Sequence, residues 1–336
     1  PSHLGRRIMA ARERHRMRLN ETTFSIAEGL ISQAATIGAE IHEIGGVRVL
    51  DCGVKAPGSD AAGLGMARTA LGGGGDATLI PVGGRDSAWQ ECPWPTVRTA
   101  SQQPVAACLA AQYAGWRIAT EGFFAMASGP VRAAIGREDL FETIGMRERP
   151  DVAVGVLETA RLPPEDVCRK LAADAGVSPQ RLIILVARTA SRAGTLQVVA
   201  RSLETALHKL HDLGFDLGRV QRGTGVAPLP PVPANDLLAI GRTNDAILYG
   251  GSVTLEVTGD DASLTTIGPR AVSQGSPAFG QPFLRVFEAA GRDFYRIDPA
   301  LFAPARLEFL NLETGTTHRF GSPMPELVAA SFAARG

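Results

Sequence analysis

A run of four glycines at residues 72–75 follows a predicted helix and precedes a predicted strand. The helix is expected to begin at Ser59 or Asp60 and to end near Leu71, and the strand to cover residues 77–82. A dinucleotide-binding glycine loop must instead follow a strand and open a helix. We therefore interpret the glycines as a helix C-cap and tight turn.

The other helix and strand signals do not alternate in a strict βαβ pattern. Apolar runs at residues 152–157 and 182–186 are typical of buried strands. We expect helices at 22–43, 104–114, 162–175 and 197–213, strands at 47–50, 246–249, 253–257, 294–297 and 305–312, and loops at 223–233 and 258–281. Since no lysine follows a glycine, a P-loop is excluded. The pattern favours an α+β fold that is not a Rossmann or P-loop fold.

The charge balance argues against a general nucleic-acid binder. The 336 residues include 34 Lys+Arg and 34 Asp+Glu, so the formal net charge is zero, whereas such binders are usually basic. The apolar run near the middle of the chain, residues 182–187, is far shorter than the roughly 20 residues of a membrane span. We expect neither nucleic acid nor a membrane as a partner.

Residues 1–20 contain six arginines and no apolar stretch typical of a secretory signal. We interpret them as a flexible basic arm, while a mitochondrial-type presequence or translated upstream sequence are alternatives. Only Lys55, Lys170 and Lys209 are lysines, so cationic functions must fall to arginine.

The cysteines and histidines show no metal-binding spacing. Cys52, Cys92, Cys108 and Cys168 form no C-x-x-C motif, which favours reduced, partly buried thiols in a cytosolic protein. The pair of His208 and His211 lacks an evident third ligand. We expect no metal site.

One candidate for catalysis is a helical face that contains Arg201, Glu204 and His208, which the spacing places together. A carboxylate held beside an arginine stays ionised and oriented, as a general base requires. The alternative is a surface ion pair that contributes less than about 1 kcal/mol.

Two further clusters could contact a flat heterocycle. The polar run 241–245 precedes a predicted strand, and its carboxylate matches the paired N–H groups of an aminopyrimidinone; the alternative is an Asx turn that caps the loop. The adjacent aromatics Phe123 and Phe124 precede a Ser-Gly-Pro turn at 128–130, and their alternative role is core packing.

From about residue 23 to 333 the sequence resembles the methenyltetrahydromethanopterin cyclohydrolase family, especially the bacterial branch that uses the dephosphorylated cofactor. The resemblance is carried by many stretches in the same order, which are Asp51-Cys52-Gly53-Val54, Gln112-Tyr113-Ala114-Gly115-Trp116, Gly122-Phe123-Phe124-Ala125, Ser128-Gly129-Pro130, Gln197 through Glu204, Gly241 through Gly251, Asp293 through Asp298 and Leu301 through Ala305. No single motif among them would be specific.

The resemblance implies a cytosolic homotrimer with two α/β parts, here about 21–160 and 161–336, and a ligand pocket between them. It implies an enzyme without a metal or prosthetic group, whose substrate is a tetrahydromethanopterin-type carrier of one-carbon units. The implied reaction is reversible hydrolysis of the cyclic N5,N10-methenyl cation, in its phosphorylated or dephospho form, to the N5-formyl form.

In this family an Arg-x-x-Glu pair lies at the reacting carbon, and Arg201 and Glu204 match it. Glu204 is then expected to take a proton from the attacking water, with Arg201 holding it ionised. Substrate-binding residues are expected within the matching stretches, with Phe123 and Phe124 beside the pterin, Asn244 and Asp245 at its polar edge, and Ser128 and Gln197 as further contacts.

The sequence also departs from the family pattern. Ala187-Arg188-Thr189 stands where the family usually has Ala-Pro-Thr. Such changes leave open a divergent, non-catalytic pterin-binding homologue or scaffold. Hydrolysis of the analogous folate is a weaker alternative, because the folate enzymes form a different family.

Overall fold

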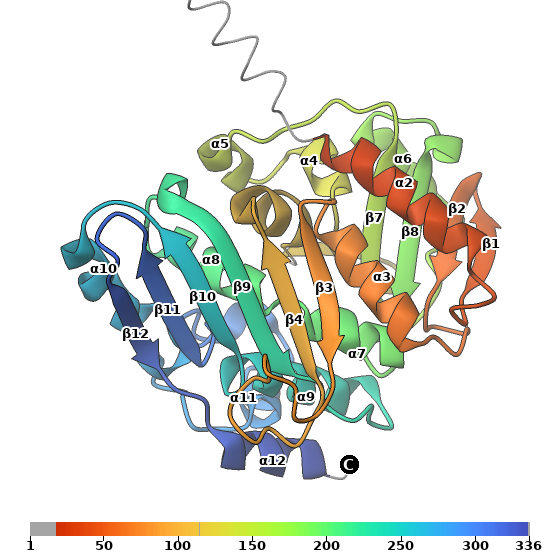
Figure 1. Ribbon diagram of the computed structural model, residues 1–336. Helices are drawn as coiled ribbons and strands as arrows, with labels where there is room; N and C mark the ends of the chain where they lie inside the picture. The colour runs from red at the N-terminus through yellow and green to blue at the C-terminus, as the bar shows by residue number, and fades with distance from the viewer. Residues whose placement is uncertain (1–17, 114, 335–336) are drawn as a thin grey trace, which may run out of the picture.

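The protein is described by a computed structural model that covers residues 18–113 and 115–334. Two mixed six-stranded sheets, each flanked by helices, confirm the predicted α+β fold (Figure 1). The predicted arm lies outside the described residues up to position 17, and α2 (Leu19–Ser32) includes its last two residues. No helix within the described ranges is long and apolar enough to cross a membrane.

The first sheet, sheet A, has parallel strands at its centre and antiparallel strands at both edges. Its order is β1 (Glu40–Ile44), β2 (Val47–Asp51), β8 (Leu182–Ala187), β7 (Ala153–Glu158), β6 (Phe123–Ser128) and β5 (Trp116–Thr120). β8 pairs in parallel with β2 and with β7. The carboxyl ends of β7 and β8 therefore lie side by side.

Sheet A is buried on both faces because successive strand residues point in opposite directions. On β8, Ile183 and Leu185 pack with residues of α2 and α3 (Asp60–Ala70), whereas Leu182 and Ile184 pack with residues of α6 (Glu165–Ala175). Figure 1 shows α2 and α3 in front of β7 and β8. Burial on both faces explains the continuous apolar runs in the sequence.

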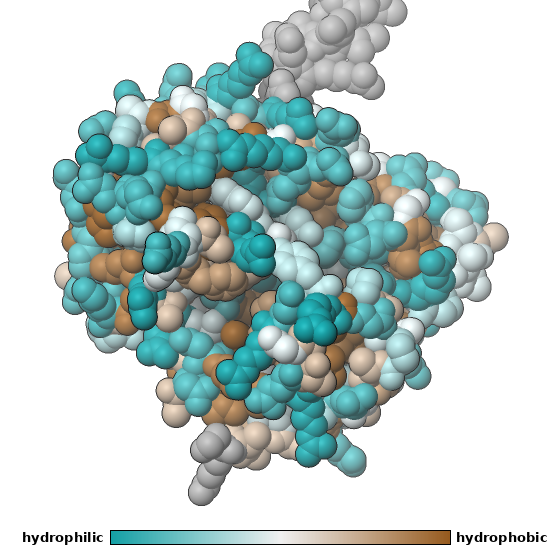
Figure 2. All heavy atoms as spheres, turned by 180° about the vertical axis from the view of Figure 1, so that it is seen from behind, coloured by the Kyte–Doolittle hydropathy of each residue, from teal (hydrophilic) through white to brown (hydrophobic). Residues whose placement is uncertain are grey.

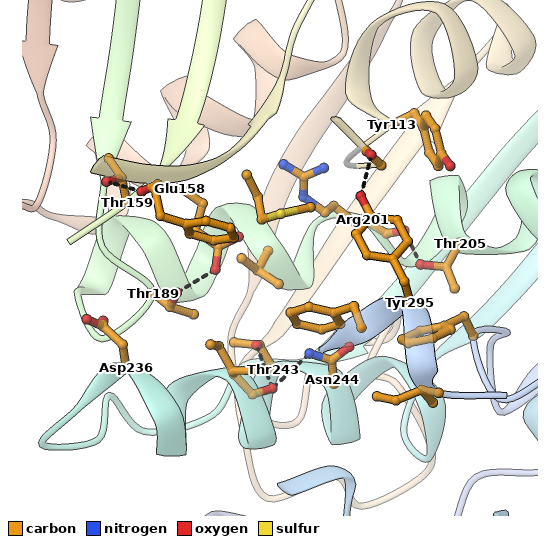
Figure 3. Close-up of a pocket in the computed structure, with 18 of the residues that line it drawn as sticks. Tyr113, Glu158, Thr159, Thr189, Arg201, Thr205, Asp236, Thr243, Asn244 and Tyr295 are labelled. Atoms are coloured by element: carbon orange, nitrogen blue, oxygen red, sulfur yellow. Dashed lines mark hydrogen bonds between the residues drawn. The ribbon is translucent and has the colours of Figure 1, made fainter. Parts of the chain in front are cut away.

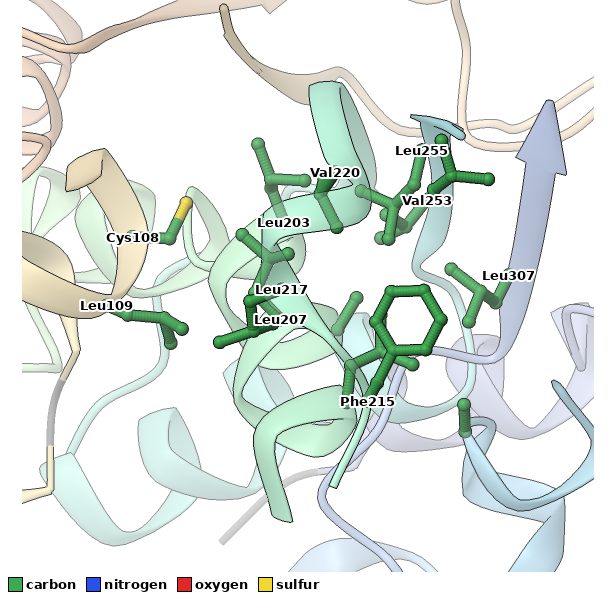
Figure 4. Close-up of a cluster of buried hydrophobic side chains, with 14 of the residues drawn as sticks. Cys108, Leu109, Leu203, Leu207, Phe215, Leu217, Val220, Val253, Leu255 and Leu307 are labelled. Carbon is green, nitrogen blue, oxygen red and sulfur yellow. The ribbon is translucent and has the colours of Figure 1, made fainter. Parts of the chain in front are cut away.

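The second sheet, sheet B, is buried mainly on one face. Its order is β12 (Thr317–Gly321), β11 (Arg306–Asn311), β10 (Ser252–Val257), β9 (Val220–Pro228), β4 (Thr96–Ser101) and β3 (Gly75–Ile80). Leu203 and Leu207 of α8 (Ser202–Asp212) share a buried cluster with Val253 and Leu255 of β10 (Figure 4). Thr254, which stands between Val253 and Leu255 on β10 and points to the other face, is exposed.

The two sheets draw their strands from interleaved parts of the chain. β3 and β4 precede residue 160 but belong to sheet B, and β8 follows it but belongs to sheet A. A single boundary near residue 160 therefore does not separate the two lobes, each of which is one sheet with its flanking helices.

The remaining helical segments connect or flank the sheets. They are the π-helix η1 (Val105–Gln112), α4 (Val131–Ile135), α5 (Leu140–Ile144), η2 (Pro179–Arg181), α7 (Arg192–Val199), η3 (Leu217–Arg219), α9 (Asp236–Leu248), α10 (Asp261–Ile267), η4 (Gly268–Arg270), η5 (Ser273–Gly275), α11 (Phe283–Ala289), η6 (Phe294–Arg296) and α12 (Pro325–Ala333).

The glycine run closes α3, as predicted, since Gly72 and Gly73 have φ of 64° and 74°. The predicted helix 22–43 was too long, because α2 is followed by a turn in which Gly38 has φ of 70°, and a strand begins at Glu40. The helix itself ends at Ser32, and its C-cap residue Gln33 has φ of −107°, so the left-handed Gly38 belongs to the turn that leads into β1.

The predicted helix 197–213 is broken between α7 and α8. The carbonyl of Ala200 accepts hydrogen bonds from Thr99 Oγ1 at 2.8 Å and from Gln112 Nε2 at 3.2 Å. These side chains meet the hydrogen-bonding need of a carbonyl at a helix end. The break places Arg201 at the N-cap of α8.

Four other local predictions were wrong. The predicted strand 246–249 is the end of α9, because a short apolar run does not distinguish a buried helix from a strand. The predicted loop 223–233 is largely β9, in which a Cβ on Gly225 would lie 2.6 Å from the backbone N of Leu203, so glycine allows α8 to approach. The predicted loop 258–281 contains α10, and 294–297 is mostly the 3₁₀ turn η6.

Candidate active site

A pocket of about 960 Å³ lies where the ends of sheet A face α8, α9 and η6. The face opposite to that of Figure 1 is hollowed near its centre (Figure 2). Polar side chains in the wall come from both lobes and include Tyr113, Glu158, Thr159, Arg161, Thr189, Arg201, Glu204, Thr205, His208, Asp212, Asp236, Thr243, Asn244 and Tyr295. The cavity is large enough for a drug-sized ligand.

Arg201 is buried in the pocket wall and held by three separate elements. Its Nη1 donates to the carbonyl of Gln112 at 2.6 Å, and its Nη2 donates to Ser128 Oγ at 3.0 Å and to Gln197 Oε1 at 3.1 Å. Desolvation lowers the pKa of Arg201, while the charges of Glu204 and Glu158 raise it. The guanidinium is therefore fixed in orientation before any ligand arrives.

Two predicted substrate contacts belong to this support. Ser128 and Gln197 are fully buried and do not line the pocket. Both side chains accept hydrogen bonds from Arg201 Nη2. The structure thus brings Ser128, Gln197 and Arg201 together. In it, Ser128 and Gln197 position the arginine and do not line the pocket.

Glu204 lies in the first turn of α8 and faces the pocket. It is only 5% exposed, and no hydrogen bond or ion pair joins its carboxyl to another residue in the described part of the chain. Burial raises the pKa of Glu204 to about 7, although the charges of Arg201 and Arg132 lower it. A carboxyl with this pKa can both accept and donate a proton near neutral pH.

The ion pair expected from the spacing of Arg201 and Glu204 is absent from the structure. The alternative, a surface ion pair, is also wrong because both side chains are buried. Arg201 acts on Glu204 through space, and desolvation outweighs its charge. With a pKa of about 7, Glu204 is not kept fully ionised at neutral pH by Arg201 alone.

His208 follows Glu204 by one helical turn and also lines the pocket. Its ring lies edge-to-face against Tyr113, with centroids 4.4 Å apart, and its Nε2 lies 3.5 Å from Asp212 Oδ1. Burial lowers the pKa of His208. The predicted helical face therefore presents Glu204 and His208 to the same cavity.

Strand geometry separates the two predicted aromatic contacts. Neighbouring residues on β6 point to opposite faces, and Phe124 is 54% exposed whereas Phe123 is buried in the cluster with residues of α6. Both residues border the pocket, but Phe124 has the accessible ring. Met126 lines the same pocket from the face of Phe124.

The polar run 241–245 lies within α9, so its members point in different directions. Asn244 lines the pocket, with its Nδ2 donating to the carbonyl of Ile240 at 2.8 Å. Asp245 faces the core, where its carboxyl accepts from the N–H of Phe283 at 2.8 Å and from Ser331 Oγ at 2.6 Å. The structure does not bring Asp245 to the pocket.

Several pocket residues were not singled out from the sequence, above all Glu158, Thr189 and Asp236. Glu158 ends β7, and Thr189 follows the end of the neighbouring parallel strand β8. Ligands in sheets of this kind bind outside the carboxyl ends of parallel strands. Polar residues directly after the two predicted buried strands were the signal that could have found them.

Tyr295 connects the two lobes at the pocket. Its hydroxyl donates to the carbonyl of Gly115 at 3.0 Å, and Arg117 lies 5.8 Å from its ring centroid. Because Tyr295 is itself 64% exposed, this connection lies at the rim.

No group of three or more His, Cys, Asp or Glu side chains in the described ranges could hold a metal ion. The four cysteines are buried and unpaired with one another. The pocket wall contains a buried carboxyl, Glu204, and an oriented guanidinium, Arg201.

The fold and the site define a protein with a pocket for a small molecule, whose wall includes a buried carboxyl and a fixed guanidinium. The family described as Cyclohydrolase (MCH) matches residues 18–332. A methenyltetrahydromethanopterin cyclohydrolase of Methylobacterium sp. (strain 4-46) is 44% identical over 321 residues, covering 94% of this chain and 97% of that protein. The chain belongs to this cyclohydrolase family, as its sequence predicted.

The similarity extends across distant organisms. The methenyltetrahydromethanopterin cyclohydrolase of Rhodopirellula baltica is 44% identical over 295 residues, which cover 86% of this chain and 87% of that protein. The protein of the same name from Methanosarcina mazei is 36% identical over 321 residues, which cover 94% of this chain and 98% of that protein.

Proposed function

We propose that this enzyme opens the cyclic amidinium of 5,10-methenyl-tetrahydromethanopterin, or of its dephospho form, to give 5-formyl-tetrahydromethanopterin. The names of the bacterial relatives support the substrate class. The observation that carries the proposal is Glu204, a buried carboxyl with no protein partner in the described chain, which faces the pocket beside the fixed Arg201.

The chemistry follows from the charge of the substrate. Its methenyl carbon belongs to a cation and is attacked by water, while Glu204 takes a proton from that water. The bond from this carbon to N10 then breaks, and the proton passes from Glu204 to N10. The hydroxyl oxygen on the carbon loses its proton to solvent as it becomes the carbonyl oxygen of the formyl group on N5, so the change from a cation and water to a neutral product releases one proton overall.

The substrate itself supplies the charge that ionises the base. Glu204 is close to half ionised at neutral pH because burial raises its pKa to about 7. A cation placed against its carboxylate lowers that pKa. Arg201, held by Gln112, Ser128 and Gln197, donates toward the oxygen of the attacking water and keeps it beside Glu204.

The proposal includes the wider properties that the family resemblance implies. The reaction runs reversibly in one-carbon metabolism, in the cytoplasm, and in a homotrimer. The enzyme requires no metal or prosthetic group, and the tetrahydromethanopterin-type carrier enters only as the substrate.

The test is an absorbance assay with methenyl-tetrahydromethanopterin, its dephospho form and methenyl-tetrahydrofolate in parallel. Turnover of either methanopterin form, exceeding that of the folate, is the expected result. Binding of a methanopterin form without turnover of any substrate would instead indicate a pterin-binding homologue. Turnover of the folate alone would overturn the proposed substrate.

A further inference from the structure

The pocket has a second acidic end, apart from Glu204. Glu158, Thr189 and Asp236 lie at one end of the view in Figure 3, Tyr113 and Thr205 lie at the other, and Arg201 lies between them. This end is formed by the carboxyl ends of β7 and β8 and by the start of α9. The chemistry proposed above uses none of its side chains.

Asp236 is already occupied by protein donors. Its Oδ1 accepts from the N–H of Ala190 at 2.7 Å and from Arg188 Nε at 3.2 Å, and its Oδ2 accepts from Arg188 Nη2 at 3.0 Å. An ion pair with two parallel hydrogen bonds leaves this carboxylate little capacity for a ligand. Asp236 therefore shapes the wall without offering a free acceptor.

Glu158 has an oxygen without a protein partner. Its Oε1 accepts a hydrogen bond from the hydroxyl of Thr189, and no residue in the described chain donates to its Oε2. The side chain has no ion pair within the described ranges, although the charge of Arg201 lowers its pKa. Burial raises its pKa more than the hydrogen bond from Thr189 lowers it, as expected for a carboxyl with a single donor in an enclosed site.

The surroundings of Glu158 fit a flat ring approached by its edge. Met126 is the β6 partner of Glu158 in the strand register, and Phe124, two residues away, lies on the same face of β6. The backbone carbonyl of Phe124 accepts from the hydroxyl of Thr159, which ties this part of β6 to the end of β7. An apolar wall beside one fixed carboxylate binds an aromatic ring that has N–H groups along one edge.

We propose that Glu158, positioned by Thr189, is the acceptor for the paired N–H groups of an aminopyrimidinone ring and determines that the pocket takes a pterin rather than a 2,4-dioxo analogue. This inference rests on the proposed function only in taking a pterin as the ligand. The aminopyrimidinone edge and N5 lie on opposite sides of the fused ring. Binding at Glu158 therefore directs N5 and the reacting carbon toward Arg201 and Glu204.

The test compares two rings that differ at this edge. 6-Hydroxymethylpterin offers an amino group and a ring N–H to a carboxylate, whereas 6-hydroxymethyllumazine has a carbonyl oxygen in place of the amino group. Calorimetry measures the affinity of each for the wild type and for Glu158→Gln. We expect the wild type to prefer the pterin by roughly tenfold or more, since hydrogen bonds to charged groups are the stronger ones.

Glu158→Gln replaces one acceptor by a donor while keeping the shape of the side chain. We expect this variant to lose most of the preference for the pterin, because it binds the pterin more weakly and the lumazine more strongly. Glu121→Gln, in the exposed turn after β5 and outside the pocket wall, is the matched control and keeps the wild-type preference.

Thr189→Val provides a second variant that leaves the carboxyl in place. Removing the hydroxyl frees Glu158 to rotate, so the preference for the pterin falls by a smaller factor than in Glu158→Gln. This variant carries the test alone if Glu158→Gln does not fold. An unchanged ring preference in both folded variants, or no preference in the wild type, overturns the inference.

Binding and turnover separate this inference from the proposed function. If the ring preference shifts as expected but no methenyl substrate is hydrolysed, Glu158 keeps its role and the catalytic proposal fails. If the substrate is hydrolysed and Glu158→Gln keeps the wild-type ring preference, the catalytic proposal stands and the inference about Glu158 fails.

Discussion

Two buried carboxyls of this enzyme have similar pKa values in different surroundings. Burial raises the pKa of both Glu204 and Asp245 to about 7. Asp245 has both oxygens satisfied, by the N–H of Phe283 and the hydroxyl of Ser331, and so ties α11 and α12 to α9. Glu204 has no such donor in the described chain and faces a cavity. The comparison teaches that a raised pKa reports burial, and that the pattern of partners indicates the role.

The largest expected effect is on the rate of Glu204→Gln. The general-base step contributes about 10²- to 10⁴-fold, so we expect the hydrolysis rate to fall by that factor. The thermal midpoint should change little, because the wild-type carboxyl makes no hydrogen bond to the described protein. Initial rates test the predicted loss of activity, and a thermal melt tests the predicted unchanged midpoint. A near-normal rate would end the assignment and remove the contrast with Asp245.

Asp245→Ala should lower the stability and leave the activity nearly unchanged. The substitution leaves a buried N–H of Phe283 and a buried hydroxyl of Ser331 without their acceptor, which costs about 2–4 kcal/mol of unfolding free energy. Substrate affinity and rate should be nearly normal in the protein that remains folded. Chemical denaturation combined with steady-state kinetics provides the measurement. A large loss of affinity with normal stability would mean that Asp245 does contact the substrate.

The stability should fall as pH rises from about 4 to 7. In this range the folded Asp245 keeps a proton that the unfolded chain has already lost, since its pKa is raised to about 7. Each such proton contributes about 1.4 kcal/mol per pH unit, so the decrease reaches at most about 4 kcal/mol for this group. Denaturation at several pH values should show a shallower slope for Asp245→Asn. Equal slopes would contradict the buried, protonated carboxyl.

The value of kcat/KM should rise as pH rises toward 7, whereas the stability falls over the same range. Hydrolysis needs the ionised form of Glu204, and kcat/KM reports the pKa of the free enzyme. We therefore expect kcat/KM to fall by about tenfold per pH unit below pH 7 and to level off above it. Since the bound cation lowers this pKa, kcat should begin to fall only at a lower pH. An inflection near pH 4 in kcat/KM would show that Glu204 is not desolvated.

The smallest expected effect is that of Ser128→Ala, which removes one of three acceptors that hold Arg201. A hydrogen bond to a charged group of this kind is worth about 1.5 kcal/mol, so we expect roughly a tenfold loss in kcat. Ser202→Ala is the matched control, because the buried Ser202 hydroxyl has no hydrogen-bond partner in the described chain. Equal effects of the two changes would show that Ser128 does not position Arg201.

Local patterns in the sequence gave correct predictions for features that form within a single helix or strand. The glycines after α3 have the left-handed conformation of a helix cap, and the run 182–186 is a buried strand. The spacing of Glu204 and His208 correctly placed both on one side of α8. The helix break at Ala200 was not predictable in this way, because Thr99 and Gln112, about 100 and 90 residues away, satisfy its carbonyl.

The sequence by itself determined the fold class and the family, and it singled out Arg201 and Glu204, which both line the pocket, since periodicity and ordered motifs are local properties of the chain. Only the tertiary structure decided which neighbour faces the pocket, so that Asn244 lines it and Asp245 lies in the core. It also placed Glu158 beside Thr189, through the parallel pairing of β7 and β8. The reason is physical: spacing sets the direction of a side chain on its own element, whereas desolvation and hydrogen bonding depend on what the rest of the chain packs against it.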